Sequence, residues 1–186
     1  MSRTALLIVD VQQGLDDPKL GKRNNPSAEA NMARLLAAWR ARNKPVIHIQ
    51  HSSTRPSSPL WAEKPGFAFK KEVTPQEGEK VFVKRVNSAF VGTDLENYLR
   101  EKDIGALVVM GLTTDHCVSA TTRTASDLGF EVEVVSDATA THERTDPEGH
   151  AFGAEDIHRV HLASLHGEFC TVVTTDVVLA GLEPVP

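Results

Sequence analysis

Six short apolar segments, separated by helical patterns or long polar stretches, constrain the fold of this chain more than any other feature. Runs of this length, rich in Val, Ile and Leu, are typical of strands buried on both faces of a sheet. Their alternation with helices predicts an α/β fold with three layers, Rossmann-like, in which a six-stranded, mainly parallel sheet carries helices on both faces. The predicted strands are Thr4–Asp10, Val46–Gln50, Val81–Lys84, Ala106–Met110, Glu131–Val135 and Glu168–Val173.

The segments between these strands divide into helices and one long loop. Helices are predicted from about Ser27 to Arg42, after Thr93, around Cys117 until Gly129, and from about Pro147 to His166. Residues 51–78 are rich in Ser, Pro and Gly, and a loop of that length in a compact domain usually serves a functional site. A length of 186 residues, with no internal repeat or linker, predicts a single domain over residues 1–186.

Composition narrows the classes of function. A net charge of −5 argues against partners such as nucleic acid and anionic membranes. Two cysteines make no disulfide framework, no signal peptide is evident, and no apolar stretch has the length of a bilayer span. We therefore expect a cytoplasmic protein.

Three chemically active residues stand at the ends of predicted strands. Asp10 closes the first strand, Lys84 closes the third, and Cys117 follows the fourth. Because the carboxyl ends of parallel strands meet at one edge of a sheet, these residues should converge there. Cys117 also lies near the start of a predicted helix, where unpaired N–H groups and the helix dipole favour a thiolate. A carboxylate beside a thiol can take its proton, and a lysine cation can hold that carboxylate in place, so the set suits hydrolysis.

The stretches around these residues carry a resemblance to a known family. They read LLIVDVQQG around Asp10, VFVKRVNSAF around Lys84 and GLTTDHCVSATTRTASDLGF around Cys117, with VVSDATA at 134–140 and HRVHLASLHGEFCTVVTT at 158–175. From Leu6 to about Val178 the chain resembles the isochorismatase-like cysteine hydrolases. That family includes nicotinamidases, N-carbamoylsarcosine amidase, ureidoacrylate and biuret hydrolases, and isochorismatase itself.

The resemblance implies a role for each of these residues. Asp10 would be the general acid/base, Lys84 its charged partner and Cys117 the nucleophile. It also implies a cis peptide bond between Leu112 and Thr113, with the backbone N–H groups of Thr113 and Cys117 forming an oxyanion hole.

One departure from the family concerns metal binding. Nicotinamidases hold a metal ion with an Asp-x-His pair after the second strand and a further histidine downstream. Here residues 50–53 read QHSS, and no histidine occurs between His51 and His116. We therefore expect no catalytic metal and no cofactor, and nicotinamidase activity is disfavoured. His158 and His161, one helical turn apart on an amphipathic helix, are interpreted as structural, and Cys170 as a core residue.

The preferred function is a cysteine-dependent hydrolase that cleaves small non-peptide amide or carbamoyl C–N bonds through a Cys117 thioester. A vinyl-ether hydrolase of the isochorismate type and a non-enzymatic ligand-binding or redox-sensing protein remain as alternatives. A small-molecule substrate and a homo-oligomer, a dimer or tetramer, are the expected partners. Candidate substrate-binding residues are Gln12, His51, Trp61, Asn87, Ser88, Phe90 and His116.

Overall fold

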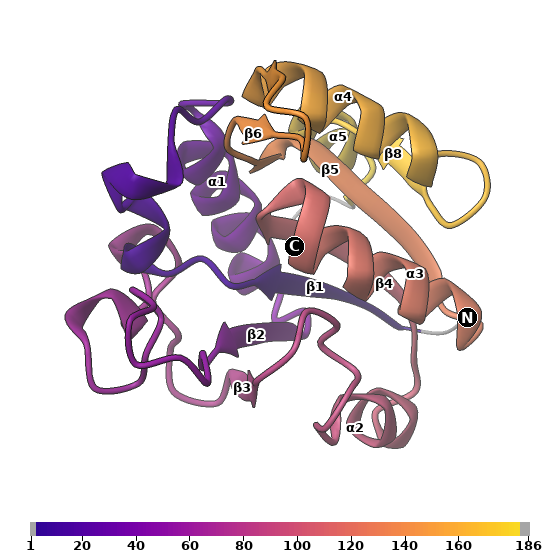
Figure 1. The fold of residues 1–186 in the computed structure, drawn as a ribbon. Helices are drawn as coiled ribbons and strands as arrows, with labels where there is room; N and C mark the ends of the chain where they lie inside the picture. Colours follow the sequence, from indigo (N-terminus) through magenta and orange to yellow (C-terminus); the bar gives the residue numbers. More distant parts are fainter. Residues whose placement is uncertain (1–2, 183–186) are drawn as a thin grey trace.

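The computed structural model describes residues 3–182, and its centre is a six-stranded sheet in which every pair of neighbouring strands is parallel (Figure 1). The strand order is β3-β2-β1-β4-β5-β8, which confirms the predicted α/β architecture. The chain runs outward from β1 to β3 and then returns to β4, so the order reverses between β1 and β4. Ligands of such sheets bind beyond the carboxyl ends at this reversal. The strands are β1 Arg3–Val9, β2 Val46–His51, β3 Lys80–Lys84, β4 Ile104–Leu112, β5 Glu131–Ala140 and β8 Thr171–Val173.

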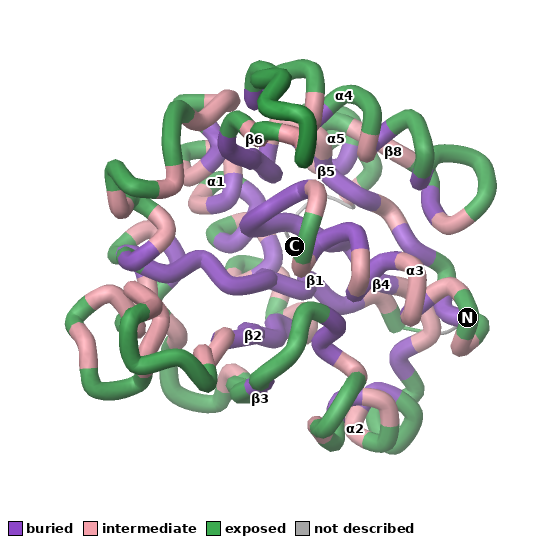
Figure 2. The backbone as a smooth tube through the Cα atoms, in the orientation of Figure 1, coloured by how far each residue is buried: buried purple, intermediate pink, exposed green. Residues whose placement is uncertain are grey.

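Helices cover both faces of the sheet and create two hydrophobic cores. α1 (Ala28–Ala41) and α5 (Thr175–Ala180) pack on one face. α2 (Leu95–Glu101), α3 (Ser119–Asp127) and α4 (Ala154–Leu165) pack on the other. From Ala5 to Val9, successive β1 side chains alternate between the two cores, which explains why this stretch is apolar. Figure 2 shows the buried course of β1 through the middle of the molecule. Each fully buried Leu or Ile side chain stabilises the fold by about 1.5–3 kcal/mol.

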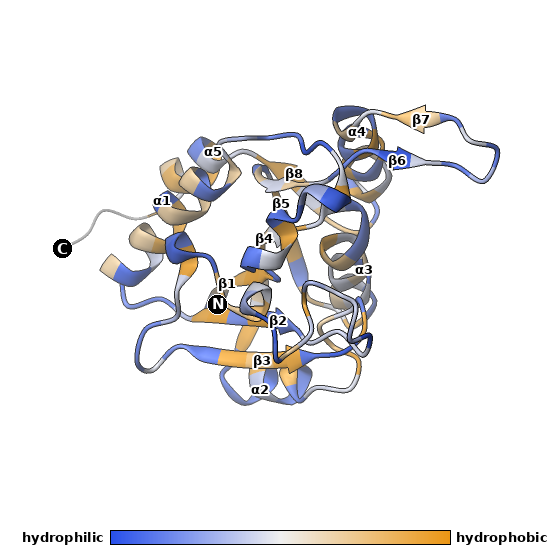
Figure 3. Cartoon of the chain, turned by 60° about the vertical axis from the view of Figure 1, so that its left-hand side comes forward, coloured by the Kyte–Doolittle hydropathy of each residue, from blue (hydrophilic) through white to orange (hydrophobic). Residues whose placement is uncertain are grey.

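The predicted helix over residues 147–166 is wrong at its beginning, because α4 starts only at Ala154. A small antiparallel hairpin precedes it, made of β6 (Arg144–Thr145) and β7 (Ala151–Phe152), and it projects from the body beside α4 (Figure 3). The Asp146 carboxylate accepts hydrogen bonds from the backbone N–H groups of residues 148 and 150, which closes a turn instead of a helix.

Two strand boundaries differ from the predictions by three residues or more. β5 continues five residues beyond Val135, to Ala140, and β8 begins at Thr171 instead of Glu168. Gly167, with a φ of +86°, turns the chain after α4, so residues 168–170 complete a turn before the strand. The extension of β5 matters for the site, because it moves the residues after this strand to the carboxyl edge of the sheet.

The long segment between β2 and β3 gathers at the carboxyl edge of the sheet, where short helical turns stiffen it (Figure 1). Lys70 anchors it, since its buried ammonium lies 2.6 Å from both Asp16 Oδ1 and Glu29 Oε1. Gln12 adds a second anchor through a 2.8 Å hydrogen bond to the Phe67 carbonyl. No helix within residues 3–182 combines the length and hydropathy of a membrane span.

Candidate active site

The turn after β1 depends on an unusually close approach between two strands. Gly111 of β4 lies opposite Val9 of β1 with a φ of +132°, and a Cβ atom there would lie 2.1 Å from the Val9 carbonyl oxygen. Only glycine fits that approach. Asp10 follows with a φ of +51°, in the left-handed region that Asp tolerates better than most residues. The carboxylate thus leaves the end of β1 beside the end of β4.

Lys84, the last residue of β3, joins the acid to the thiol. Its ammonium lies 2.6 Å from Asp10 Oδ2 and 3.3 Å from Cys117 Sγ, and both Lys84 and Asp10 are about 1% exposed. It also donates to the Val86 carbonyl at 3.0 Å and lies 3.0 Å from His51 Nδ1. The sheet edge therefore brings together the three residues that the sequence placed at strand ends.

Cys117 lies in a single wide helical turn, Thr114–Val118, that precedes α3. The peptide bond between Leu112 and Thr113 is cis. Burial raises the pKa of the Cys117 thiol well above its ordinary value, and the neighbouring Asp10 charge raises it further, whereas Lys84 opposes both. This shift is opposite to the thiolate that the helix start was expected to favour, because loss of hydration and a nearby anion both disfavour the charged form of the thiol.

Asp10 is suited to accept the thiol proton. Burial raises the pKa of its carboxyl above 3.8, while Lys84 pulls that pKa down. Asp10 Oδ1 is buried and has no hydrogen-bond partner among residues 3–182, whereas Oδ2 accepts a hydrogen bond from Lys84. A buried acceptor with spare capacity beside a protonated thiol is the arrangement that general-base catalysis needs.

The donor atoms of Asp10, His51 and Cys117 lie within 4.8 Å of one another, close enough to share a metal ion. The Lys84 ammonium, however, already lies among them at 2.6, 3.0 and 3.3 Å. An ammonium carries three donors and no acceptor, so it supplies the positive charge that a metal would bring. This set of groups does not suit a resident divalent cation.

A cavity of about 210 Å³ opens onto the thiol. Three of the predicted substrate-binding residues, His51, Asn87 and His116, line it, as do Leu112 and Thr113 of the cis bond. The remaining walls, which the sequence analysis missed, are Leu15, Leu20, Leu60, His142 and Arg144.

Four other predicted contacts do not line this cavity. Gln12 is buried and clamps the backbone of residue 51 from both sides, and Ser88 hydrogen-bonds to the Thr124 hydroxyl at 2.9 Å. Phe90 stacks on the Phe130 ring in the core. Trp61 does not line the cavity, whereas its neighbour Leu60 does.

His142 and Arg144 could have been predicted from their position after a strand end. Both residues follow the carboxyl end of β5, as Cys117 follows the carboxyl end of β4. Because β5 was predicted to end at Val135, they were not expected at the carboxyl edge of the sheet. Arg144 donates to Asp115 Oδ2 at 2.8 Å. Although burial opposes ionisation, hydrogen bonds from Arg144 and Thr141 hold the pKa of Asp115 at about 2. Asp115 therefore forms an ion pair with Arg144, which lines the cavity.

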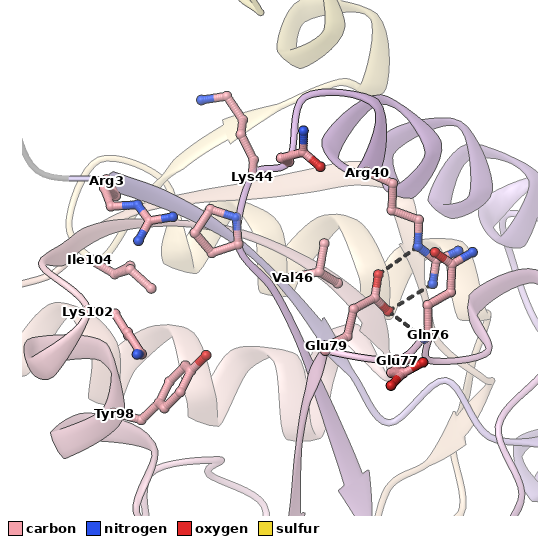
Figure 4. A pocket seen from close by; sticks show the side chains of 13 residues that line it. Arg3, Arg40, Lys44, Val46, Gln76, Glu77, Glu79, Tyr98, Lys102 and Ile104 are labelled. Atoms are coloured by element: carbon pink, nitrogen blue, oxygen red, sulfur yellow. Dashed lines mark hydrogen bonds and ion pairs between the residues drawn. The ribbon is translucent and has the colours of Figure 1, made fainter.

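Larger cavities also occur among the described residues, and two of them have volumes of about 450 Å³. One is at the amino edge of the sheet, where the Arg40 guanidinium pairs with Glu79 at 2.7 Å, and no cysteine, serine or threonine of the described residues 3–182 lines it (Figure 4). The other adjoins the thiol cavity and shares His51 and Asn87 with it.

Known proteins match this fold and site over most of the chain. Residues 4–177 match the Isochorismatase domain. The uncharacterized isochorismatase family protein YrdC of Bacillus subtilis is 46% identical over 174 residues, 94% of this chain and 93% of that protein. The crystal structure of a putative hydrolase of the isochorismatase family from Chromobacterium violaceum superposes with a TM-score of 0.93 at 46% identity, covering 96% of this chain and 92% of that one.

A more distant relative has a named activity. The ureidoacrylate amidohydrolase RutB of Methylobacterium radiotolerans is 27% identical over 201 residues, covering 89% of this chain and 74% of that protein. The domain match and the 46% identity to YrdC over nearly both full lengths are the decisive findings. These two findings show that this chain belongs to the isochorismatase family of hydrolases.

Proposed function

We propose that the protein is a cysteine-dependent amidohydrolase that cleaves a small, non-peptide C–N bond through a thioester on Cys117. The observation that carries the proposal is the contact of one buried lysine with both a carboxylate, at 2.6 Å, and a thiol, at 3.3 Å. The amidohydrolase name of RutB supports the choice of an amide bond.

The first half-reaction forms the thioester. Asp10 takes the thiol proton as Sγ bonds to the substrate carbonyl carbon, so the thiolate forms only as it attacks. The backbone N–H groups of Thr113 and Cys117 stabilise the oxyanion. When the tetrahedral intermediate collapses, the C–N bond breaks and Asp10 returns the proton to the leaving nitrogen. Lys84 keeps Asp10 in place throughout.

The second half-reaction reverses these roles. Asp10 takes a proton from water, the hydroxide attacks the thioester carbon, and the C–S bond breaks. The proton returns to Cys117, and the product is a carboxylic or carbamic acid. The four leucines of the cavity surround a compact apolar group, since a space of 210 Å³ excludes larger substituents.

Acid-quenched intact-protein mass spectrometry during turnover of a panel of small amides, ureides and carbamoyl compounds tests the proposal. We expect an acyl adduct on wild type and on Cys170→Ala, which removes the other, buried cysteine, and none on Cys117→Ala. Turnover that survives Cys117→Ala would refute the proposal.

The assembly state and location are part of the same proposal. We propose a cytoplasmic homo-oligomer, supported by exposed valines on and after the edge strand β3: Val81, Val83, Val86 and Val91. Light scattering at micromolar concentration should give a multiple of 20.3 kDa, and a monomeric mass would contradict it.

A further inference from the structure

A second cavity lies against the active site. It has a volume of about 450 Å³, twice that of the thiol cavity, and the two share His51 and Asn87 as walls. Its other walls come from the segment after β2 and from the residues that directly follow Lys84. They are Ser53, Thr54, Arg55, Ser57, Ser58, Arg85 and Val86.

The lining of this outer cavity is positively charged. Arg55 and Arg85 both face it, and no Asp or Glu within residues 3–182 lines it. His51 adds no charge near neutral pH, because burial and the neighbouring Lys84 lower its pKa to about 4. Four hydroxyl groups complete the walls, and those of Ser53 and Ser58 accept hydrogen bonds from backbone N–H groups, which leaves their own hydrogens free to donate.

Arg55 and Arg85 differ from most other arginines of the chain in the hydrogen bonding of their side chains. Seven of the arginine side chains bind a carboxylate, a carbonyl or a hydroxyl group of the protein: Arg23, Arg34, Arg40, Arg42, Arg100, Arg123 and Arg144. The guanidinium groups of Arg55 and Arg85 make no ion pair or side-chain hydrogen bond with residues 3–182. A guanidinium with all its donors available favours a carboxylate or a phosphate, to which it can bind in a bidentate manner.

The outer cavity is also tied to the catalytic groups. Arg85 follows Lys84 in the chain, and the carbonyl of Val86 accepts a hydrogen bond from the Lys84 ammonium. Asn87 then reaches the thiol cavity, with its Oδ1 3.9 Å from Cys117 Sγ. One short segment therefore lines both cavities, so a molecule with its amide at Cys117 can extend past His51 and Asn87 toward the two arginines.

We propose that the outer cavity is an anion subsite of this active site, in which Arg55 and Arg85 bind a carboxylate or phosphate group carried by the substrate. The inference rests on the proposed amidohydrolase function and specifies its substrate class. The reactive amide is compact and occupies the leucine-lined inner cavity, and the anionic group lies beyond it.

Binding to the inactive Cys117→Ala variant tests the subsite without turnover. The probes are succinamate and butyramide, which have the same four-carbon amide framework and differ in one carboxylate. NMR titration at low salt should show succinamate binding about 10-fold more tightly, since hydrogen bonds to charged groups are the strong ones. This advantage should shrink as salt screens the charges. Inorganic phosphate, titrated in parallel, should compete with succinamate if the subsite also accepts phosphate groups.

Replacement of both arginines supplies the decisive comparison. In Arg55→Ala/Arg85→Ala the preference for succinamate should disappear and butyramide binding should stay unchanged. Arg55→Gln/Arg85→Gln, which keeps polar side chains without the charge, should behave in the same way. Arg159→Ala, which removes an exposed arginine of α4 outside the cavity, should change neither affinity.

Each contrary result identifies its own cause. Equal affinity of the two amides, no detectable binding of succinamate, or a preference that survives both double replacements would overturn the subsite. In the last case Arg144 of the inner cavity would be the anion-binding group. Failure to form an acyl adduct, with the arginine-dependent binding intact, would instead refute the amidohydrolase mechanism alone.

Discussion

Replacement of Lys84 by methionine removes the charge that compensates the buried Asp10 carboxylate. At the 2.6 Å separation of Nζ and Oδ2, Coulomb attraction is about 6 kcal/mol for an effective dielectric constant of about 20. Breaking a buried pair by removing one partner costs about 3–5 kcal/mol, because the remaining charge stays without water. We therefore expect Lys84→Met to lower the free energy of unfolding by about 3–5 kcal/mol. The total for a typical protein is about 5–15 kcal/mol.

The loss should depend on pH. Removing the ammonium takes away the charge that lowers the pKa of Asp10, so this pKa rises further above the unfolded-state value of 3.8. A carboxyl that binds its proton more tightly in the folded state loses stability as pH rises from the unfolded pKa through the folded one. The deficit of Lys84→Met relative to wild type should therefore be small at pH 4 and complete at pH 8.

Urea unfolding of four proteins at both pH values measures the effect. Asp10→Asn/Lys84→Met, which carries no buried charge at this point, should recover most of the stability that Lys84→Met loses. Lys80→Met removes an exposed lysine from the same strand and should cost about 1 kcal/mol or less, since the ammonium of this lysine lies over the rings of Phe82 and Tyr98. A deficit that is equal at pH 4 and pH 8, or that persists in the double variant, would refute the assignment to an uncompensated carboxylate.

Three further predictions follow from the same structure. Gly111→Ala should lower the melting temperature markedly, by a loss of about 3 kcal/mol or more, because its Cβ would lie 2.1 Å from a backbone oxygen; an unchanged melting temperature would contradict the strand approach. Although burial opposes it, hydrogen bonds from Arg23 and Lys70 lower the pKa of Glu29 to about 2, so its contribution to stability is present above pH 4.5 and lost as pH falls toward 2. Glu29→Gln should flatten acid unfolding monitored by circular dichroism in that range, and a curve parallel to wild type would argue against the pair. Iodoacetamide should alkylate Cys117 slowly at pH 7, as judged by mass spectrometry, and rapid alkylation at pH 6 would show that the unliganded protein holds a thiolate.

Residues at the carboxyl edge of the sheet could be predicted wherever a strand end can be read from the sequence. Asp10, Lys84 and Cys117 meet because each follows an apolar run of known direction, and parallel strands place such ends together. His142 and Arg144 could not be placed at this edge in the same way, because β5 extends through Ser136 and Asp137, polar residues that hide the rest of the strand. The length of β5 depends on its pairing with β4. This pairing continues to Ala140 and is not encoded in local hydropathy.

By itself, the sequence determined the parallel α/β architecture, the two cores and the edge at which an acid, an amine and a thiol converge, because these follow from periodicity and chain direction. Only the tertiary structure decided the direction in which the pKa of Cys117 shifts, since burial and the Asp10 charge come from residues distant in the chain. It alone also decided which side chains of the 52–79 segment face the site. There Leu60 lines the thiol cavity and Trp61 does not, because the path of a loop depends on anchors such as Lys70 and Gln12, not on its own composition.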